Sequence, residues 1–256
     1  MKLKGLVVLI TGGASGIGES LARLLICKEA IVIICDVQIE KGNLLESEFK
    51  DKLKFYPCDI TSESEVENMI NEIEKLYGRL DCLVNNAGVG VAELTATPNS
   101  VASKSMYDFV FGINTFGVFN ITRFAAKLML KNSQKNDSLC NGCIVMVSSV
   151  AGIEGQKGQV AYAGSKGALL GMTLPLARDL GRYKIRVNSV CPGTIETPMT
   201  APVMDSKNIK SMIDNTPIKR PGRPIEVADT ILFYIENDFL NGTQIRIDGG
   251  MRFPHF

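Results

Sequence analysis

Short apolar runs alternate along the chain with longer stretches in which apolar residues recur at helical spacing. The runs hold almost no polar position, which is typical of strands buried on both faces of a parallel sheet. We therefore predict strands at 6–10, 31–35, 54–56, 82–84, 144–147, 186–190 and 244–247. The intervening patterns predict helices at 16–28, 39–49, 63–77, 106–131, 160–180 and 225–236.

This regular alternation predicts an α/β fold of the Rossmann type, a doubly wound, seven-stranded parallel sheet with helices on both faces. A length of 256 residues fits one large domain, so residues 1–256 are expected to form a single domain. Three polar stretches, 91–105, 132–142 and 198–218, interrupt the alternation and show no clear helical period.

Charge and cysteine content exclude some classes of partner. A formal net charge of +1 gives no electrostatic case for nucleic acid or acidic membranes. No apolar run reaches the ~18–20 residues of a membrane-spanning helix. Cys140 and Cys143 have the spacing of a metal or redox pair, but the only histidine is His255 and further ligands are lacking. We expect no metal site, and free thiols in a reducing compartment.

A glycine-rich turn follows the first predicted strand and opens the first helix, at Thr11-Gly-Gly-Ala-Ser-Gly-Ile-Gly18. Glycines let the backbone approach a pyrophosphate closely, and a helix N-terminus presents free N–H groups to an anion. The spacing differs from the usual GxGxxG pattern, so the turn alone is weak evidence. Its position between strand and helix is what indicates a dinucleotide site.

Asp36 ends the second predicted strand, about twenty residues beyond this turn, where an acid hydrogen-bonds the adenosine ribose. A carboxylate there repels the additional phosphate of NADP. The neighbours Gly13 and Val37 offer no basic group to neutralise that phosphate. The predicted cofactor is therefore NAD.

Tyr162 and Lys166 stand one helical turn apart among small residues, so their side chains share a helix face on which a cofactor can lie close. A neighbouring ammonium lowers the pKa of a phenol, which then exchanges a proton with an alcohol or ketone. A tyrosine and lysine at this spacing are more commonly just an exposed helix face. Ser149 follows a predicted strand and supplies a hydroxyl for a developing oxyanion, which favours the catalytic interpretation.

In this order the motifs resemble the short-chain dehydrogenase/reductase family over almost the whole chain. Within that family, the chain is similar to the branch that oxidises 3-hydroxyacyl-CoA thioesters and hydroxysteroids. The family motifs are Thr11-Gly-x-x-x-Gly-x-Gly18, Cys58-Asp-Ile60, Asn85-Asn-Ala-Gly88, Asn114, Ser148-Ser149, Tyr162-x-x-x-Lys166 and Cys191-Pro-Gly193. The branch is indicated by Lys4-Gly-Leu-Val7, Glu154-Gly-Gln156 and residues 91–105, 171–180 and 236–242.

The resemblance implies a catalytic, dinucleotide-binding domain with a defined set of site residues. Asn114, Ser149, Tyr162 and Lys166 correspond to the catalytic group, in which Asn114 holds a water that links Lys166 to solvent. The cofactor would contact Gly12, Ser15, Gly16, Ile17, Gly18, Asp36, Asp59, Ile60, Asn86, Ala87, Gly88, Tyr162, Lys166, Pro192, Gly193, Ile195 and Thr197. Ile195 replaces a bulkier aromatic residue expected in the branch, and Asn86 stands where animal relatives have cysteine.

The substrate prediction rests on the segment 198–218, an apolar, methionine-containing lid expected over the nicotinamide. Ser149, Gln156 and Tyr162 are the expected substrate contacts. The resemblance then favours oxidation of (S)-3-hydroxyacyl-CoA by NAD, with hydroxysteroids as slower substrates. One alternative is another ketone or alcohol, as in the 3-oxoacyl-carrier-protein reductases, which usually prefer NADPH. A second is a scaffold that binds NAD and acts on a protein or RNA partner.

Assembly and compartment are predicted from the resemblance as well. The helices at 106–131 and 160–180 carry more apolar positions than one sheet face needs, and family members pair these helices into homotetramers. Pro175 is expected to kink the second of them without ending it. The animal branch implies mitochondria, whereas the few residues before Gly5 cannot form an Arg-rich presequence. A cytoplasmic location is the alternative.

Overall fold

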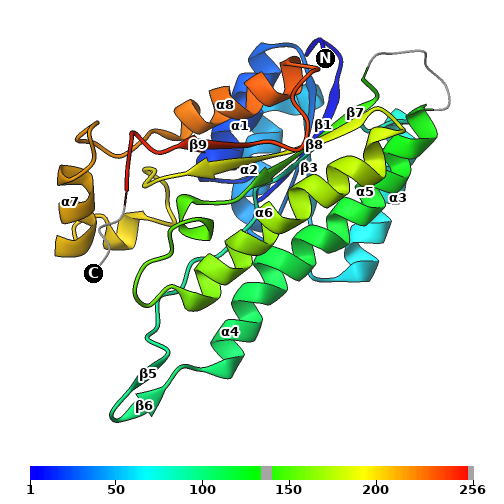
Figure 1. The fold of residues 1–256 in the computed structure, drawn as a ribbon. Helices are drawn as coiled ribbons and strands as arrows, with labels where there is room; N and C mark the ends of the chain where they lie inside the picture. Colours follow the sequence, from blue (N-terminus) through cyan, green and yellow to red (C-terminus); the bar gives the residue numbers. More distant parts are fainter. Residues whose placement is uncertain (134–139, 253–256) are drawn as a thin grey trace.

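The computed structural model describes residues 1–133 and 140–252, and Figure 1 shows their arrangement. A seven-stranded parallel sheet has the strand order β3-β2-β1-β4-β7-β8-β9. Its strands are β1 (Val7–Thr11), β2 (Ile31–Asp36), β3 (Leu53–Pro57), β4 (Cys82–Asn85), β7 (Gly142–Val147), β8 (Ile185–Pro192) and β9 (Gln244–Ile247). The predicted doubly wound α/β fold is confirmed, since each predicted strand lies within or beside an observed one.

Helices cover both faces of this sheet (Figure 1). The helices are α1 (Gly16–Cys27), α2 (Ile39–Phe49), α3 (Glu63–Tyr77), α4 (Lys104–Phe111), α5 (Val118–Ser133), α6 (Val160–Gly181), α7 (Lys207–Asp214) and α8 (Pro224–Glu236). Strand side chains alternate between faces, so Val8 and Ile10 join the apolar core beneath α1 and α8. Val7 and Leu9 join the second core, which packs against α3, α5 and α6. This double burial explains why the strands read as continuous apolar runs.

The sheet changes its winding direction at β1, whose neighbours are β2 and β4. In open α/β sheets, ligands bind outside the carboxyl ends of the strands at such a switch point. The glycine-rich turn follows β1, Asp36 ends β2, and Ser149 lies two residues beyond β7. The topology therefore brings together residues that lie far apart in the sequence.

The helix predicted at 106–131 is interrupted in the structure. Between α4 and α5 lies a π-helical segment, η2 (Gly112–Gly117), which contains Asn114. An isolated stretch of π-helix commonly marks a functional site, because the additional residue per turn redirects side chains. The continuous apolar pattern does not reveal this local change of pitch.

Two short elements occur where the sequence shows no period. The hairpin of β5 (Ala96–Thr97) and β6 (Ser100–Val101) projects beyond α4 (Figure 1). Within 198–218, α7 forms a separate helix whose Ile209, Met212 and Ile213 have helical spacing. The predicted polar stretch 132–142 falls partly on 134–139, outside the described residues. The helix α6 runs past Pro175 to Gly181, so this proline does not end it, as predicted.

Candidate active site

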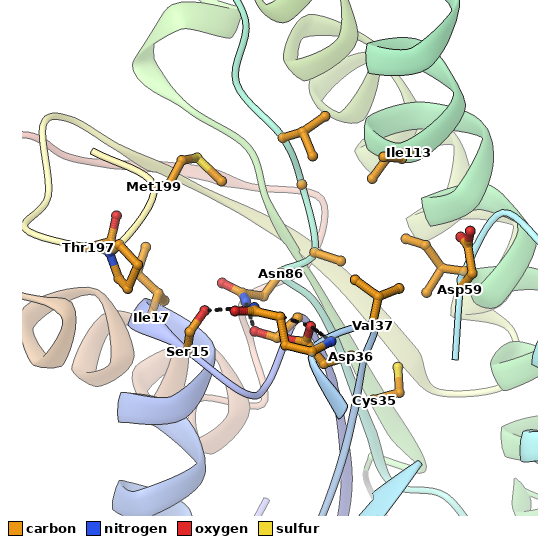
Figure 2. A pocket seen from close by; sticks show the side chains of 18 of the residues that line it. Ser15, Ile17, Cys35, Asp36, Val37, Asp59, Asn86, Ile113, Thr197 and Met199 are labelled. Carbon is orange, nitrogen blue, oxygen red and sulfur yellow. Dashed lines mark hydrogen bonds between the residues drawn. The ribbon is translucent and has the colours of Figure 1, made fainter. Parts of the chain in front are cut away.

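Two cavities lie at the carboxyl ends of the strands. The nucleotide cavity, of about 520 Å³, is lined by the turn after β1 and by the ends of β2, β3 and β4 (Figure 2). The substrate cavity, of about 260 Å³, is lined by Ser149, Tyr162, Gln156 and part of the segment 198–218. Met199 lines both, so the two cavities meet at this side chain.

The glycine-rich turn is shaped by close backbone contacts. Gly12 and Gly16 have positive φ angles of 62° and 58°, which residues with a Cβ atom rarely adopt. A Cβ atom on Gly18 would collide with the carbonyl oxygen of Gly12 and lie 2.9 Å from the Cα of Gly13. Glycine at position 18 therefore lets α1 begin directly against the turn.

The N-terminus of α1 opens toward the nucleotide cavity. Ser15 is the N-cap residue, and its side chain makes no capping hydrogen bond to the helix. Ser15, Gly16 and Ile17 line the cavity, so the first N–H groups of the helix are available to an anion there.

Asp36 lies buried at the end of β2 and faces the same cavity (Figure 2). Its Oδ2 accepts a hydrogen bond from the Ala14 N–H at 3.1 Å, and its Oδ1 accepts one from the Gln38 N–H at 3.0 Å. The Gln38 side chain also donates to Asp36 Oδ1 and, at 3.4 Å, to Ser15 Oγ. The carboxylate is thus fixed between the turn after β1 and the start of α2.

Asn86 supports the turn from beneath. Its Nδ2 donates to the carbonyl oxygens of Thr11 and Gly12 at 3.1 and 2.9 Å. Thr11 Oγ1 in turn accepts the N–H groups of Asn86 and Ala87. Asn86 and Ala87 both line the nucleotide cavity, as does Gly88, but the amide nitrogen of Asn86 is engaged by the protein's own backbone.

The segment after β3 lines another side of the nucleotide cavity. Asp59 and Ile60 both line the cavity there. Asp59 Oδ1 accepts hydrogen bonds from the N–H and the hydroxyl of Thr61, which fixes the carboxylate at the start of the loop. Ile60 is buried and packs against Gly117 of η2.

Ser149 and Tyr162 both line the substrate cavity, one from the segment after β7 and the other from α6. Ser149 follows β7 and its Oγ accepts the N–H of Ala151 at 3.1 Å. Tyr162 lies in the first turn of α6. Burial raises the pKa of the Tyr162 phenol, and a hydrogen bond with Ser149 lowers it by a smaller amount. In the protein itself, Tyr162 is therefore held as the neutral phenol, a proton donor.

Lys166 is buried behind Tyr162, where its Nζ donates to the carbonyl oxygen of Val147 at 2.9 Å. Burial lowers the pKa of the Lys166 ammonium from its ordinary value to about 8. A Cβ atom placed on Gly88 would lie 3.1 Å from both Lys166 Nζ and Asn114 Oδ1, so these two polar groups flank Gly88. The helix α6 and the loop after β4 thus meet at this glycine.

Asn114 is fully buried in the π-helical segment. Its Oδ1 accepts the Val89 N–H at 2.8 Å, and its Nδ2 donates to Val89 O and to Ser165 Oγ. Ser165 Oγ then donates to the carbonyl oxygen of Tyr162 at 2.8 Å. Asn114 therefore ties the loop after β4 to the first turns of α6, which carry Tyr162 and Lys166.

Residues after β8 divide between the cavities. Pro192 is the last residue of β8, Gly193 lines the substrate cavity, and Thr197 lines the nucleotide cavity. Ile195 lines neither of these two, because its side chain lies in the core and packs against Gly222. The identity of residue 195 therefore acts on the packing behind the site and not on the lining of these two cavities.

The lining of the substrate cavity combines Gln156 with methionines. Gln156 Nε2 contacts Met212 Sδ at 3.1 Å, and Met199 and Met251 also line the cavity. Within 198–218, Val203 and Ile209 contribute as well.

Three supporting residues escaped the sequence analysis. Thr11, Gln38 and Ser165 hold the turn after β1, Asp36 and Asn114 respectively, through the hydrogen bonds described above. Thr11 begins the glycine-rich motif and Ser165 lies between Tyr162 and Lys166, so their positions beside Gly12 and Lys166 could have indicated a supporting role. Nothing in the sequence singles out Gln38. The described residues hold no group of three or more His, Cys, Asp or Glu side chains placed to bind a metal ion. His255 lies outside the described residues.

A nucleotide cavity at the switch point, adjoining a serine, a tyrosine and a lysine, defines a dinucleotide-dependent oxidoreductase site. The family model described as enoyl-(acyl carrier protein) reductase matches residues 12–252. The chain belongs to the short-chain dehydrogenase/reductase family, whose dehydrogenases generally use nicotinamide cofactors. No helix among the described residues has the length and apolar character to cross a bilayer.

Individual relatives carry several names. The chain is 42% identical to 3-hydroxyacyl-CoA dehydrogenase type-2 of Drosophila melanogaster, over 98% of each sequence. It is 38% identical to 3-oxoacyl-(acyl-carrier-protein) reductase FabG of Thermotoga maritima, over 98% of this chain and 99% of that one. The solved structure of 3-hydroxyacyl-CoA dehydrogenase type-2 from Mycobacterium avium is similar, with a TM-score of 0.90, 33% identity and 99% coverage of both chains.

Proposed function

We propose that this enzyme oxidises (S)-3-hydroxyacyl-CoA to 3-oxoacyl-CoA with NAD. The observation that carries the proposal is the junction of the two cavities: Ser149 and Tyr162 face a small, largely apolar cavity, and Met199 joins it to the cavity that contains Asp36. The names of the Drosophila and Mycobacterium relatives support the substrate class.

The residues present fit a nicotinamide dinucleotide. The turn after β1 and the open N-terminus of α1 suit a pyrophosphate, and the fixed carboxylate of Asp36 suits the hydroxyls of the adenosine ribose. The same carboxylate repels a 2′-phosphate, which favours NAD over NADP. Bound NAD supplies the acceptor for the hydride that leaves the alcohol carbon.

The chain's own residues then handle the proton and orient the substrate. Tyr162 takes the alcohol proton in oxidation and returns it in reduction. Ser149 donates a hydrogen bond to the reacting oxygen and stabilises its developing charge. With the cationic oxidised nicotinamide bound, the Lys166 ammonium favours the phenolate of Tyr162, and it also binds the nicotinamide ribose. Asn114 positions this group by joining the loop after β4 to α6.

Gln156 and the methionines give the substrate cavity its selectivity. Methionine side chains adapt to varied apolar shapes, which suits an acyl chain. The Gln156 amide reaches the same cavity and is placed to donate to a thioester or ketone oxygen. The segment 198–218 acts as the lid over this cavity, since Met199, Val203 and Met212 line it.

The deciding assay follows NADH consumption with acetoacetyl-CoA, a 17-ketosteroid and an acetoacetyl-carrier-protein, each at matched concentration. We expect the highest kcat/KM with acetoacetyl-CoA. The reverse ranking, with acetoacetyl-CoA inert, refutes the substrate assignment and leaves the dehydrogenase chemistry in place. The carrier-protein arm also tests the second candidate, a 3-oxoacyl-carrier-protein reductase, which the name of the Thermotoga relative favours.

Cofactor choice is tested by titrating NAD and NADP against the wild type and Asp36→Asn. Removing the charge should shift the ratio of the two Kd values by about ten-fold or more toward NADP. The exposed Asp51, changed to Asn, is the matched control and should leave the ratio unaltered. Equal affinity of the wild type for both cofactors contradicts the proposal.

The enzyme is further proposed to assemble as a homotetramer. Large apolar side chains are exposed along α4, η2 and α5, at Phe109, Phe116 and Phe119, and at Leu174 on α6. Leu169 is another apolar residue of the predicted helix 160–180, but it is buried in the core against the sheet and contributes nothing to that surface. Light scattering at micromolar concentration should give four times the monomer mass, and a monomer mass refutes the assembly.

A further inference from the structure

Two cysteines lie at the adenosine end of the nucleotide cavity. Cys35 immediately precedes Asp36 on β2, and Cys58 immediately follows β3. Both line the cavity and both are free thiols. Figure 2 shows Cys35 beside Asp36 and Val37, at the side of the cavity away from Thr197 and Met199. The chemistry described above uses neither thiol.

Strand register brings the two cysteines to the same place. Cys35 pairs with Tyr56 and Asp36 with Pro57 in the parallel ladder. The Cys58 N–H continues this ladder by donating to the Asp36 carbonyl oxygen at 3.2 Å. Because side chains two residues apart share a strand face, Cys58 lies on the same face as Tyr56 and thus as Cys35. The two thiols belong to one apolar cluster and line the same cavity.

A second cysteine pair in the same sheet provides a contrast. Cys82 and Cys143 face each other directly across β4 and β7, and the Cys143 thiol donates to the carbonyl oxygen of Tyr234 at 3.8 Å. Both are fully buried in the core and line neither the nucleotide nor the substrate cavity. Cys35 and Cys58 are also buried, at 1% and 4% exposure, but they form part of the wall of the nucleotide cavity, whereas Cys82 and Cys143 line neither cavity.

We propose that Cys35 and Cys58 are a redox modification site, which hydrogen peroxide converts to a disulfide and which thereby weakens NAD binding. This inference rests on the proposed assignment of the nucleotide cavity to the cofactor. The Cys58 thiolate attacks one peroxide oxygen, the O–O bond breaks, and the hydroxide that leaves takes up a proton to give water. Cys35 then attacks the sulfenic sulfur of Cys58, the S–S bond forms, and a second water leaves. The two thiols lose two electrons and the peroxide gains them.

The contact between the thiols favours Cys58 as the attacking group. The neighbouring Cys35 thiol lowers the pKa of the Cys58 thiol against the opposing effect of burial. The pKa of the Cys35 thiol is raised, first by its interaction with Cys58 and then by burial. A thiolate is the nucleophile in oxidation, and a neighbouring thiol resolves the sulfenic acid before further oxidation.

A disulfide here would disturb the residues that hold the adenosine. Disulfide geometry requires Cβ atoms roughly 3.5–4.5 Å apart, a separation that joins the end of β2 tightly to the segment after β3. Asp36 follows Cys35, and Asp59 and Ile60 follow Cys58, and all three line the cavity. NAD binding and oxidation therefore oppose each other, and by linkage NAD must disfavour the disulfide by the same factor by which the disulfide weakens NAD binding.

The test uses the purified full-length Cys27→Ser protein, because Cys27 is the exposed cysteine among the described residues and would link molecules together. The protein is treated with hydrogen peroxide, with and without saturating NAD, and free thiols are then alkylated. Peptide mass spectrometry should find Cys35 linked to Cys58, and NAD should suppress this linkage. The Kd for NAD should rise about ten-fold on oxidation and return to its starting value after dithiothreitol.

Two variants separate the possible outcomes. Cys35→Ser and Cys58→Ser are each compared with themselves before and after peroxide, and neither should show a reversible change in Kd. A Cys82–Cys143 link in place of the expected one, no linked peptide, or a linked peptide with unchanged Kd overturns the inference. If the reduced protein fails to bind NAD at all, the proposed cofactor site fails instead, and that result is distinct from the others.

Discussion

The nucleotide cavity and the substrate cavity meet at Met199 but are built in different ways. Around the first, Asp36, Asn86 and Gly18 are fixed by backbone hydrogen bonds and by contacts too close for any Cβ atom. Around the second, Met212 contacts Gln156, and Met199 and Met251 line the wall with flexible apolar side chains. A rigid frame suits a ligand of constant shape, and an adaptable wall suits acyl chains that vary.

The largest expected effect comes from Tyr162, the proposed proton carrier, which lines the substrate cavity. Tyr162→Phe keeps the ring and removes the proton carrier, so kcat should fall by about 10²–10⁴-fold while the Kd for NAD stays unchanged. Steady-state kinetics and a cofactor titration measure the two effects separately. Lys166→Ala should impair both, since Lys166 also holds ribose. Activity above a few per cent of wild type in Tyr162→Phe would show that another base operates.

The rigidity of the nucleotide side is tested by one added methyl group. Gly18→Ala forces a Cβ atom against the Gly12 carbonyl and should lower the free energy of unfolding by about 1–3 kcal/mol and weaken NAD binding. Gly171 on α6 is the matched control, because a Cβ atom there meets nothing within 4 Å. Gly171→Ala should raise stability by up to about 1 kcal/mol. Equal denaturation midpoints for the two variants would contradict a tightly packed turn.

The burial of Lys166 behind Tyr162 should make the catalytic efficiency depend on pH. The Lys166 pKa of about 8 means that the ammonium, which binds ribose, is present below pH 8 and is lost as pH rises through that value. The raised pKa of Tyr162 keeps its phenol protonated over the same range. The kcat/KM for NADH in ketone reduction should thus be constant below pH 8 and fall about ten-fold per unit above it. A kcat/KM that stays constant up to pH 10 would refute the assignment of this pH dependence to Lys166.

The smallest effect is expected on the adaptable side. Met212→Leu preserves volume but removes the sulfur that contacts Gln156, so the KM for acetoacetyl-CoA should change only about two- to five-fold, and the Kd for NAD not at all. Met106→Leu, on α4 and outside the substrate cavity, is the control. If the KM for acetoacetyl-CoA rises in Met212→Leu by a larger factor than the Kd for NAD rises in Gly18→Ala, the contrast between the two cavities is reversed.

Local chemistry made much of the site predictable. The turn at 11–18, Asp36 and the Tyr162–Lys166 pair each carry a physical signature within a short stretch: positive φ, charge at a strand end, and i,i+4 spacing. The positions of the strands were equally predictable, because burial on both faces leaves continuous apolar runs. Gln244–Ile247, for example, is both the predicted and the observed range of β9.

Tertiary contacts decided the rest. The expected lowering of the Tyr162 pKa gives way to a raised one in the protein itself, because burial outweighs the hydrogen bond from Ser149. The π-helical turn at Asn114 and the paired thiols of Cys35 and Cys58 depend on packing and strand register, which no local pattern encodes. Ile195 was expected at the cofactor, yet its side chain packs in the core against Gly222. The sequence by itself determined which residue types stand at the strand ends, and the tertiary structure alone decided which of them face a common cavity, since that depends on contacts between segments far apart in the chain.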